Sequence, residues 1–462
     1  MNDTEILIEN HDLTENMGTA SIPQKDVTLE LIRHALQGTD SIHGWKINVK
    51  ETESIELFFI KKSLDMNRRK NVTHYMVTVF KDFEKDGILW RGSSSANIAP
   101  SMNQDEVSEI IQDLALAASF VKNKHYDLNK PETDLPDKAD SAFEKGDLSE
   151  WIPKLVESLF KGDIYSEGCL NSSEIFVNRS KNHIINSEGI DVVFDDYSGL
   201  IEIVAEWDGV KESVELFRIF KFSDMCPEKI EDEVRQLLNE CKEKAIAIPA
   251  PAMKNINVLL SGEAVGQLLD FYVGQSNAQM VYEGISTIKI GENIQGDSVD
   301  GDWISLTLEP TLKNSSSSSP YDTDGVTLKR TMIFDKGVLQ TYHGSQRYSS
   351  YLDIEPTGII KNASFAPGKF SEEVFRSEPY VELISFSAFD MDPITGDFGG
   401  EVRLARTFDG TKTTALTGAS VSLNLKECHK NMYLSKEIKQ DDSYQGPRSI
   451  LFKNASIAGV EV

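Results

Sequence analysis

The stretch VLLSGEAVGQLLDF, from Val258 to Phe271, joins a strand pattern to a helix pattern. The apolar run that ends at Leu260 is typical of a buried strand, and a serine and a glycine then interrupt it. Glu263 opens the helical pattern, and Gln267 follows one turn later. A glutamate in this position is stabilised by the helix dipole. The junction is therefore expected to lead from a sheet directly into a helix, within an α+β fold.

The same junction raises the question of a metal site. Several zinc hydrolases have a histidine at the position of Gly262, a glutamate beside it and a second histidine near Gln267. A catalytic zinc needs three protein ligands and an open position for water, and the glutamate then deprotonates that water. Glycine has no ligand atom and glutamine is a poor zinc ligand. We interpret these residues as a helix start in which Glu263 alone cannot hold zinc.

The patterns on either side divide the chain into five parts. Before the junction we expect two similar-sized α+β blocks, each reading helix, strands, helix, and after it a β-rich domain. The connector between the blocks is polar with two prolines, and residues 1–25 lack periodicity. The predicted parts are a flexible tail at 1–25, a first α+β block at 26–125, a linker at 126–146, a second α+β block at 147–248 and a β-rich C-terminal domain at 249–462.

Several local elements can be predicted within these parts. The first block has separate strand patterns at 45–49 and 55–60, and a helix pattern at 104–122 that a capping box from Ser101 to Gln104 would begin. Apolar spacing with a proline in the first turn predicts a helix over 227–245. Asp335-Lys336-Gly337 predicts a hairpin turn, and the five serines from Ser315 to Ser319 predict a mobile loop.

Composition limits the classes of partner and the compartment. The chain of 462 residues carries 74 acidic and 47 basic residues, a net charge of −27. This charge argues against direct binding to nucleic acid or to anionic membranes. The N-terminal residues show no secretory signal, and no apolar run is long enough to cross a membrane. Four dispersed cysteines without a CxxC pair suit reduced thiols. We therefore expect a cytoplasmic protein.

Other candidate ligands are dispersed along the sequence. Asp297, Asp300 and Asp302, and the pair Asp322 and Asp324, resemble fragments of calcium loops. The complete EF-hand pattern with its terminal glutamate is missing, so acidic turns are expected. Cys428 and His429 are adjacent, and neighbouring side chains on a regular element point apart. We expect Cys428 to be packed and His429 to be exposed.

Motifs in the C-terminal half resemble those of the TldD/PmbA family, also labelled "modulator of DNA gyrase" or TldD/TldE metalloproteases. YDTDGV at 321–326, KGVL at 336–339 and GPRSILF at 446–452 agree with it in order along the chain. The resemblance runs from about residue 27 to the end. Its main signature is DMDPITGDF at 390–398, with the residues Asp392, Pro393, Thr395, Gly396, Asp397 and Phe398.

The resemblance implies which type of subunit this chain is. TldD-type chains carry zinc on HExxxH and on a cysteine near the C-terminus, whereas TldE/PmbA-type chains lack these ligands and pair with a TldD-type chain. Here HExxxH falls on Gly262, Glu263 and Gln267, so the general-base glutamate is present and both histidine positions are vacant. The segment 436–446, where the third ligand is expected, contains no cysteine. The chain resembles the TldE/PmbA type.

Three functions follow from these observations. The first is a pseudo-enzyme subunit of a zinc peptidase that degrades unfolded or leader peptides, with zinc held by a TldD-type partner, no cofactor in this chain, and a heterodimer or homodimer as the assembly. The second is an independent metallopeptidase with a site rebuilt from residues such as Asp297, Asp300 or His343. The third is a non-enzymatic regulatory or binding protein.

Overall fold

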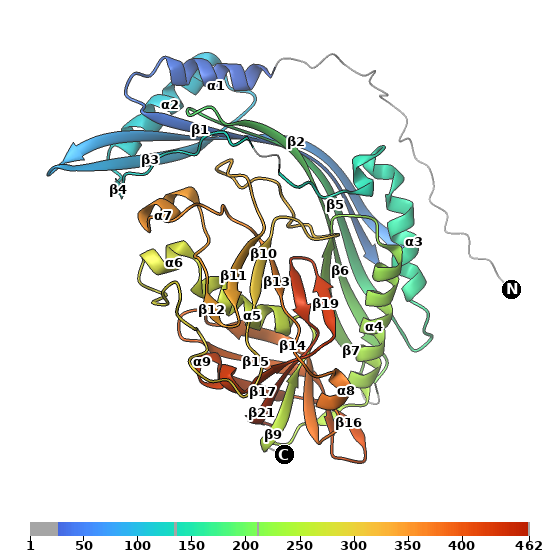
Figure 1. Ribbon diagram of the computed structural model, residues 1–462. Coiled ribbons are helices and arrows are strands. Elements are labelled where there is room, and N and C mark those ends of the chain that lie inside the picture. The colour runs from blue at the N-terminus through green and yellow to red at the C-terminus, as the bar shows by residue number, and fades with distance from the viewer. Residues whose placement is uncertain (1–25, 134–135, 210–211, 461–462) are drawn as a thin grey trace.

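The computed structural model describes residues 26–133, 136–209 and 212–460. The tail predicted at 1–25 lies outside the described residues. The described chain combines long antiparallel strands, a β-rich C-terminal half and helices on the sheet faces, which confirms the α+β fold class (Figure 1). Within it, we find no helix that is both long and apolar enough to cross a membrane.

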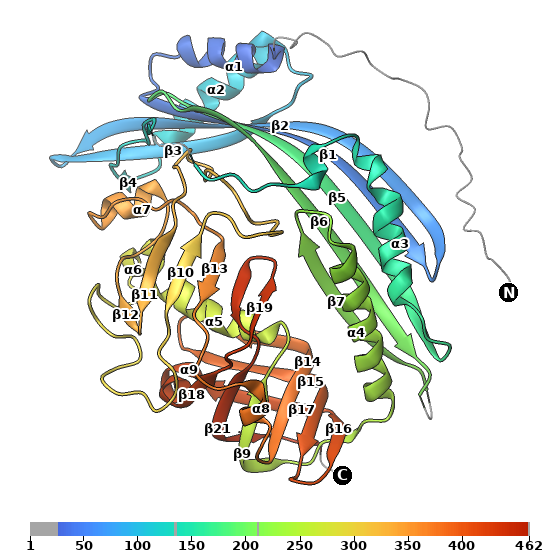
Figure 2. The same cartoon turned by 45° about the vertical axis from the view of Figure 1, so that its right-hand side comes forward.

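The strands before residue 223 form one sheet in the order β4-β3-β2-β1-β5-β6-β7. β1 pairs antiparallel with β2 on one side and with β5 on the other, so the strands of both predicted blocks belong to this sheet. Figures 1 and 2 show the long strands arching over the C-terminal half. The strands are β1 (Gly44–Ile60), β2 (Ser63–Lys85), β3 (Ile88–Ile98), β4 (Asn123–Lys124), β5 (Gly168–Asn186), β6 (Asp191–Trp207) and β7 (Val214–Phe222).

Helices cover one face of this sheet. Ile47 and Ile55 are an even number of residues apart on β1, so they point to the same face. Ile47 packs in a core with the first two helices, and Ile55 packs in a core with the next two. The helices are α1 (Val27–Gln37), α2 (Gln104–Ala118), α3 (Ile152–Gly162) and α4 (Pro227–Ala245), with short 3₁₀ turns η1 (Ala142–Glu144) and η2 (Leu148–Glu150).

Some local predictions for this half are confirmed and others need correction. The helix over 227–245 is found with the predicted bounds. The two strand patterns at 45–49 and 55–60 are parts of one strand, β1, because its polar middle pairs with β2 and β5 on both sides. The capping box before α2 uses Asn103 and Glu106 rather than Ser101 and Gln104, and the helix ends at Ala118.

The C-terminal half contains two further sheets. A larger sheet has the order β18-β21-β9-β14-β15-β16-β8, with β17 also paired to β15, and a smaller one has the order β12-β11-β10-β13-β20-β19. Their strands are β8 (Ile248–Pro249), β9 (Met253–Leu260), β10 (Leu306–Glu309), β11 (Thr331–Asp335), β12 (Val338–Leu339), β13 (Asn362–Phe365), β14 (Tyr380–Met391), β15 (Asp397–Phe408), β16 (Thr413–Thr417), β17 (Ala419–Asn424), β18 (Met432–Leu434), β19 (Ile438–Asp441), β20 (Tyr444–Pro447) and β21 (Ile450–Ile457).

A central helix fills the space between these sheets. The helix α5 is buried against both, and its Leu268, Leu269 and Tyr272 belong to the largest apolar core. The helices of this half are α5 (Ala264–Gln275), α6 (Ala278–Tyr282), α7 (Gln346–Tyr351), α8 (Glu372–Phe375) and α9 (Leu425–Cys428), followed by the 3₁₀ turn η3 (His429–Asn431).

Two loops of this half were predicted from the sequence, and the structure confirms the hairpin turn but not the mobile serine loop. The hairpin at Asp335-Lys336-Gly337 is confirmed, and Lys336 and Gly337 both have the positive φ that its turn requires. The serine run is packed rather than mobile. The hydroxyl of Ser315 donates to Asn362 at 2.7 Å, and the amide of Ser316 donates to the carboxylate of Asp442 at 2.7 Å. These partners fix a segment that composition alone marks as a flexible loop.

Candidate functional site

The predicted strand–helix junction is present between β9 and α5. The amide of Ser261 donates to the carbonyl oxygen of Leu383 on β14 at 3.1 Å, which extends the β9–β14 pairing to the start of the turn. Glu263 is the N-cap residue of α5 and has no side-chain capping hydrogen bond. Its carboxylate is thus free of the helix end, and it lines a cavity together with Gly262 and Gln267.

Gly262 has a backbone conformation that favours glycine. Its φ is +72°, in the left-handed region, and a Cβ atom on it would lie 2.7 Å from the carbonyl oxygen of Ile384. A side chain here would collide with the main chain of β14. The position expected for the first histidine ligand of a zinc site therefore lacks both a ligand atom and the room for one.

The segment expected to supply a third ligand supplies a cation instead. Lys439 on β19 donates from its Nζ to the main-chain oxygen of Gly262 at 2.6 Å, and the Nζ lies 3.9 Å from the carboxylate of Asp441. A positively charged side chain thus occupies the neighbourhood of Glu263. Together with Gly262 and Gln267, this arrangement does not fit a zinc ion, because none of the three predicted ligand positions offers a histidine or a cysteine.

Glu263 and Lys439 influence each other's pKa in the cavity. Glu263 is solvent-exposed, yet protein surrounds it on several sides, and this desolvation together with the carboxylate of Asp441 raises its pKa. Arg218 and Lys439 partly oppose that effect. Desolvation lowers the pKa of Lys439, while Asp441 and Glu263 oppose the change. Glu263 therefore lies among charges of both signs, with Arg218 and Lys439 as the cations near it and Asp441 as a second carboxylate.

The cavity has a volume of about 970 Å³ and lies between the two halves of the chain. One wall comes from β7 and α4 of the large sheet, and the other comes from β14, α5, α8 and β19 of the C-terminal half. Ion pairs join the walls: Arg406 on β15 makes two hydrogen bonds, of 2.7 and 2.9 Å, to the carboxylate of Glu243 on α4. The cavity is therefore built by residues far apart in the sequence.

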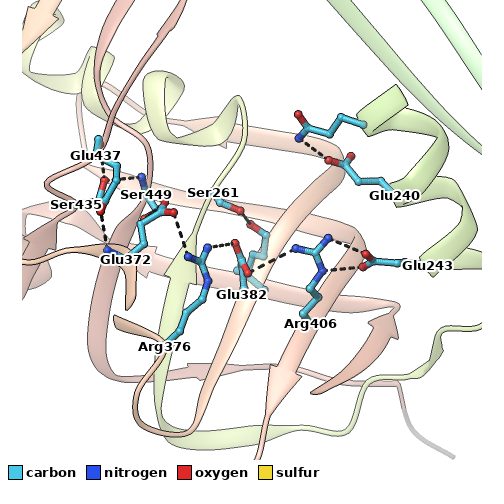
Figure 3. Close-up of polar contacts among 12 residues, drawn as sticks. Glu240, Glu243, Ser261, Glu372, Arg376, Glu382, Arg406, Ser435, Glu437 and Ser449 are labelled. Atoms are coloured by element: carbon cyan, nitrogen blue, oxygen red, sulfur yellow. Dashed lines mark hydrogen bonds and ion pairs between the residues drawn. The ribbon is translucent and has the colours of Figure 1, made fainter. Parts of the chain in front are cut away.

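A chain of alternating charges crosses the cavity floor. Glu382 is buried on β14 between Arg376, at 2.8 Å, and Arg406, at 3.9 Å (Figure 3). Arg376 also contacts Glu372, which accepts a hydrogen bond of 2.8 Å from the hydroxyl of Ser449. Each charge has an opposite neighbour, which offsets the cost of removing it from water.

Part of β14 borders the cavity along an incompletely paired edge. β14 pairs with β9 over Tyr380–Leu383, and beyond Leu383 the described strands pair with it only through β15. Residues 384–389 line the cavity. The pairing with β15 is interrupted here by register shifts, which change the direction of the strand locally. An extended peptide in the cavity would meet strand backbone here.

The signature residues from Asp392 to Phe398 lie outside the cavity lining and build the turn between β14 and β15. The carboxylate of Asp392 accepts hydrogen bonds from the amides of Ile394 and Thr395, and Gly396 has a φ of +84°. The carbonyl oxygen of Pro393 accepts a hydrogen bond of 2.5 Å from Gln275 at the end of α5. Asp397 accepts a hydrogen bond of 2.7 Å from Asn424, and Phe398 is buried. The signature positions α5 from its far end.

The other candidate ligands are dispersed. His343 is buried, and its Nε2 lies 2.9 Å from the carbonyl oxygen of Val273, to which it is hydrogen-bonded. Over the described ranges, we find no group of three His, Cys, Asp or Glu side chains that could hold a metal ion, so Asp297, Asp300 and His343 do not form one. Asp322 builds an acidic turn, as predicted, by accepting the amides of Asp324 and Val326.

The prediction for His429 was wrong. Its side chain is buried and stacks on the ring of Tyr272, whereas Cys428 packs against the core as expected. Adjacent residues can both be buried here because the short helix α9 and the turn η3 end under α5 and the loop around Gln295, whose amide donates to the carbonyl oxygen of His429.

Sequence reasoning did not identify the cations of the cavity. Arg218, Arg376, Arg406 and Lys439 come from four different strands or loops. Arg406 ends the stretch VRLAR at 402–406, which also resembles the family signature, and the other three belong to no spaced motif. The resemblance pointed to the segment 436–446 as the place of a missing ligand, and its motif at 446–452 contains Arg448, but neither assigned a cation to the cavity.

Comparison with known proteins finds related sequences over the C-terminal half and along most of the chain. A family model described as the PmbA/TldA metallopeptidase C-terminal domain matches residues 253–459. A metalloprotease of Methanocaldococcus jannaschii is 31% identical over 136 residues, which is 28% of this chain and 29% of that protein. A metalloprotease PmbA homolog of Buchnera aphidicola is 20% identical over 446 residues, covering 90% of this chain and 95% of the homolog.

A solved structure shows the same fold. The crystal structure of TldE from Thermococcus kodakarensis superposes with a TM-score of 0.74 at 16% identity, covering 93% of this chain and 99% of that one. The likeness therefore extends beyond the C-terminal domain to the large N-terminal sheet.

Proposed function

Because this chain belongs to the TldD/PmbA family, we propose that it is a TldE/PmbA-type subunit of a zinc peptidase that acts on unfolded or leader peptides. In this proposal a TldD-type partner holds the zinc, and this chain completes the peptide-binding chamber in the cytoplasm. It is a pseudo-enzyme by itself, assembled as a heterodimer, and it makes no direct contact with nucleic acid.

One observation carries the proposal. At the position where the family's zinc-binding chains have their first histidine, Gly262 has a left-handed backbone with no room for a side chain, and Lys439 donates to its carbonyl oxygen. A second observation supports peptide binding: residues 384–389 of β14 border a cavity of about 970 Å³ along an edge that is only partly paired. Strand addition at such an edge binds backbone with little sequence selectivity.

A peptidase assay tests the proposal directly. The purified chain, a TldD-type chain and their mixture are each incubated with an unfolded peptide, with and without a chelator. We expect cleavage to require the TldD-type chain, to increase on mixing and to stop with the chelator. Cleavage by this chain alone would favour the independent metallopeptidase and overturn the proposal.

A variant of Glu263 tests whether this residue acts in catalysis or the TldD-type partner supplies the catalytic base. If the partner provides the catalytic zinc and its base, E263Q should leave the mixture with at least about half of its activity. The matched control is the glutamine variant of the HExxxH glutamate in the TldD-type chain, which should abolish activity. A collapse of activity with E263Q in complexes that still assemble would mean that Glu263 acts in catalysis.

A further inference from the structure

The cavity differs in charge from the rest of the chain. Six basic and seven acidic side chains line it, whereas the whole chain has 47 basic and 74 acidic residues. The cavity is therefore close to neutral inside a strongly acidic protein. An anionic group meets less repulsion there than over most of the surface.

Four of the cavity arginines are engaged by carboxylates of the chain itself. A guanidinium that is already held by two carboxylate groups has little capacity left for a ligand. These pairs are Arg218 with Glu233 and Glu240, Arg235 with Glu231 and Asp232, Arg376 with Glu372 and Glu382, and Arg406 with Glu243 and Glu382.

Arg448 is different from these four arginines. It lines the cavity and is exposed, and within the part of the chain that the structure describes its guanidinium makes no ion pair. Its backbone is nevertheless fixed. The amide of Arg448 donates to the carbonyl oxygen of Glu437 at 2.8 Å, and the following residue, Ser449, is fully buried and hydrogen-bonded to Ser435 and Glu372. A charged group without an internal partner is thus mounted on rigid backbone.

The orientation of Arg448 follows from the β19–β20 ladder. Lys439 lies opposite Gly446, and Arg448, just past the end of β20 at Pro447, continues the pairing through its amide hydrogen bond to Glu437. Arg448 is two residues beyond Gly446, which places it on the same face as Lys439. Lys439 reaches the carbonyl oxygen of Gly262 at the start of α5. Arg448 therefore faces the cavity beside that junction, and because Lys439 is already hydrogen-bonded, Arg448 remains available to a ligand.

We propose that Arg448 binds a carboxylate group of a peptide held in this cavity, an inference that rests on the proposed peptide-binding function. A guanidinium presents two parallel N–H donors that match the two oxygens of a carboxylate. The carboxylate comes either from the C-terminus of the peptide or from an acidic side chain. The residue then fixes the position of one end or one side chain of a substrate that strand pairing alone leaves free to slide.

Binding of labelled peptides tests this assignment. The full chain, alone and together with a TldD-type subunit, is titrated by fluorescence anisotropy against three versions of one unstructured peptide. The first has a free C-terminus and no acidic side chain, the second has an amidated C-terminus, and the third is amidated and carries one glutamate. The variants are R448Q and R448K, and R403Q is the matched control, because Arg403 is exposed, outside the cavity lining and without an ion pair among the described residues.

We expect R448Q to weaken binding of a carboxylate-bearing peptide about tenfold or more, R448K to restore part of the loss, and R403Q to have no effect. Loss confined to the free-C-terminus peptide identifies the terminal carboxylate, and loss with the glutamate peptide identifies the side chain. Equal weakening of all three peptides would overturn the proposal, because the arginine would then be binding something common to all of them.

Two negative results are distinguishable. If peptides bind and R448Q binds them as tightly as the unaltered chain, the assignment of Arg448 is wrong while the proposed function stands. If none of the peptides binds even with the TldD-type subunit present, both the assignment and the proposed function are wrong. Thermal unfolding of R448Q confirms that the variant is folded in either case.

Discussion

Lys439 and Gly262 are 177 residues apart in the sequence, and the Nζ of the lysine lies 2.6 Å from the carbonyl oxygen of the glycine. This bond joins the β19–β20 hairpin of the smaller sheet to the turn between β9 and α5, which belongs to the larger one. It places a cation beside Glu263, where the predicted ligand positions offer neither a histidine nor a cysteine. The junction between β9 and α5 is thus stabilised by an internal hydrogen bond.

Replacing Lys439 tests that stabilising role. K439M keeps an unbranched side chain but loses the charged donor, so the carbonyl oxygen of Gly262 and the carboxylate of Asp441 lose a partner. Since the lysine side chain is only 19% exposed, we expect the free energy of unfolding in urea to fall by about 1–2 kcal/mol. K436M is the control, because Lys436 is exposed near the same hairpin. Equal stability of K439M and K436M would contradict the role.

Replacing Gly262 tests whether the junction can accept a side chain. In G262A the methyl group would lie 2.7 Å from the carbonyl oxygen of Ile384, and the residue would have a positive φ. We expect the free energy of unfolding to fall by about 2–4 kcal/mol, the sum of the conformational cost and the clash. Urea denaturation measures the change.

Gly284 supplies the matched control for this clash. Its φ is +74°, and nothing lies within 4 Å of the position of its Cβ. G284A should therefore cost about 1 kcal/mol, the conformational part alone. If G262A and G284A lose the same stability, the contact with the carbonyl oxygen of Ile384 is unimportant.

The sequence predicts those features that depend on neighbouring residues. Helix α4 has an uninterrupted apolar spacing and a proline in its first turn, and both of its ends were predicted correctly. The prediction divided β1 into two strands because residues Glu51 to Glu53 are polar and show no apolar alternation. In the structure these residues continue the strand and pair with β2 and β5 on both sides. Periodicity reports which face is buried, and it is weak where a strand has polar residues on both faces.

The cavity depends instead on long-range contacts. Arg406 and Glu243 are 163 residues apart, and nothing in either local sequence indicates their two hydrogen bonds. The absence of histidine at Gly262 and Gln267 could be read directly, but the positive φ of Gly262 and the position of Lys439 required the folded chain. Sequence reasoning therefore located the junction and missed the charges that surround it.

The last prediction concerns the pH dependence of stability at Asp270. Asp270 lies on α5 two turns after Glu263, on the same helix face; it reaches solvent, yet the protein around it desolvates its carboxylate and raises its pKa to about 6. The folded chain then binds this proton more tightly than the unfolded chain between pH of about 4 and about 6. The contribution of Asp270 to the free energy of unfolding therefore falls as the pH rises through that window, and it is constant above it.

D270N lacks this titration and isolates its effect. Relative to the unaltered chain, D270N should gain stability as the pH is raised from 4 to 7, and the difference between the two chains should stop changing above about pH 7. Urea unfolding of both chains at several pH values measures the difference, which removes the contributions of all other carboxylates. D65N is the control, because Asp65 is exposed on β2, far along the chain from α5. If the difference in unfolding free energy between D270N and the unaltered chain is constant across this pH window, Asp270 behaves as an aspartate in water does. That result would show that α5 does not desolvate its carboxylate.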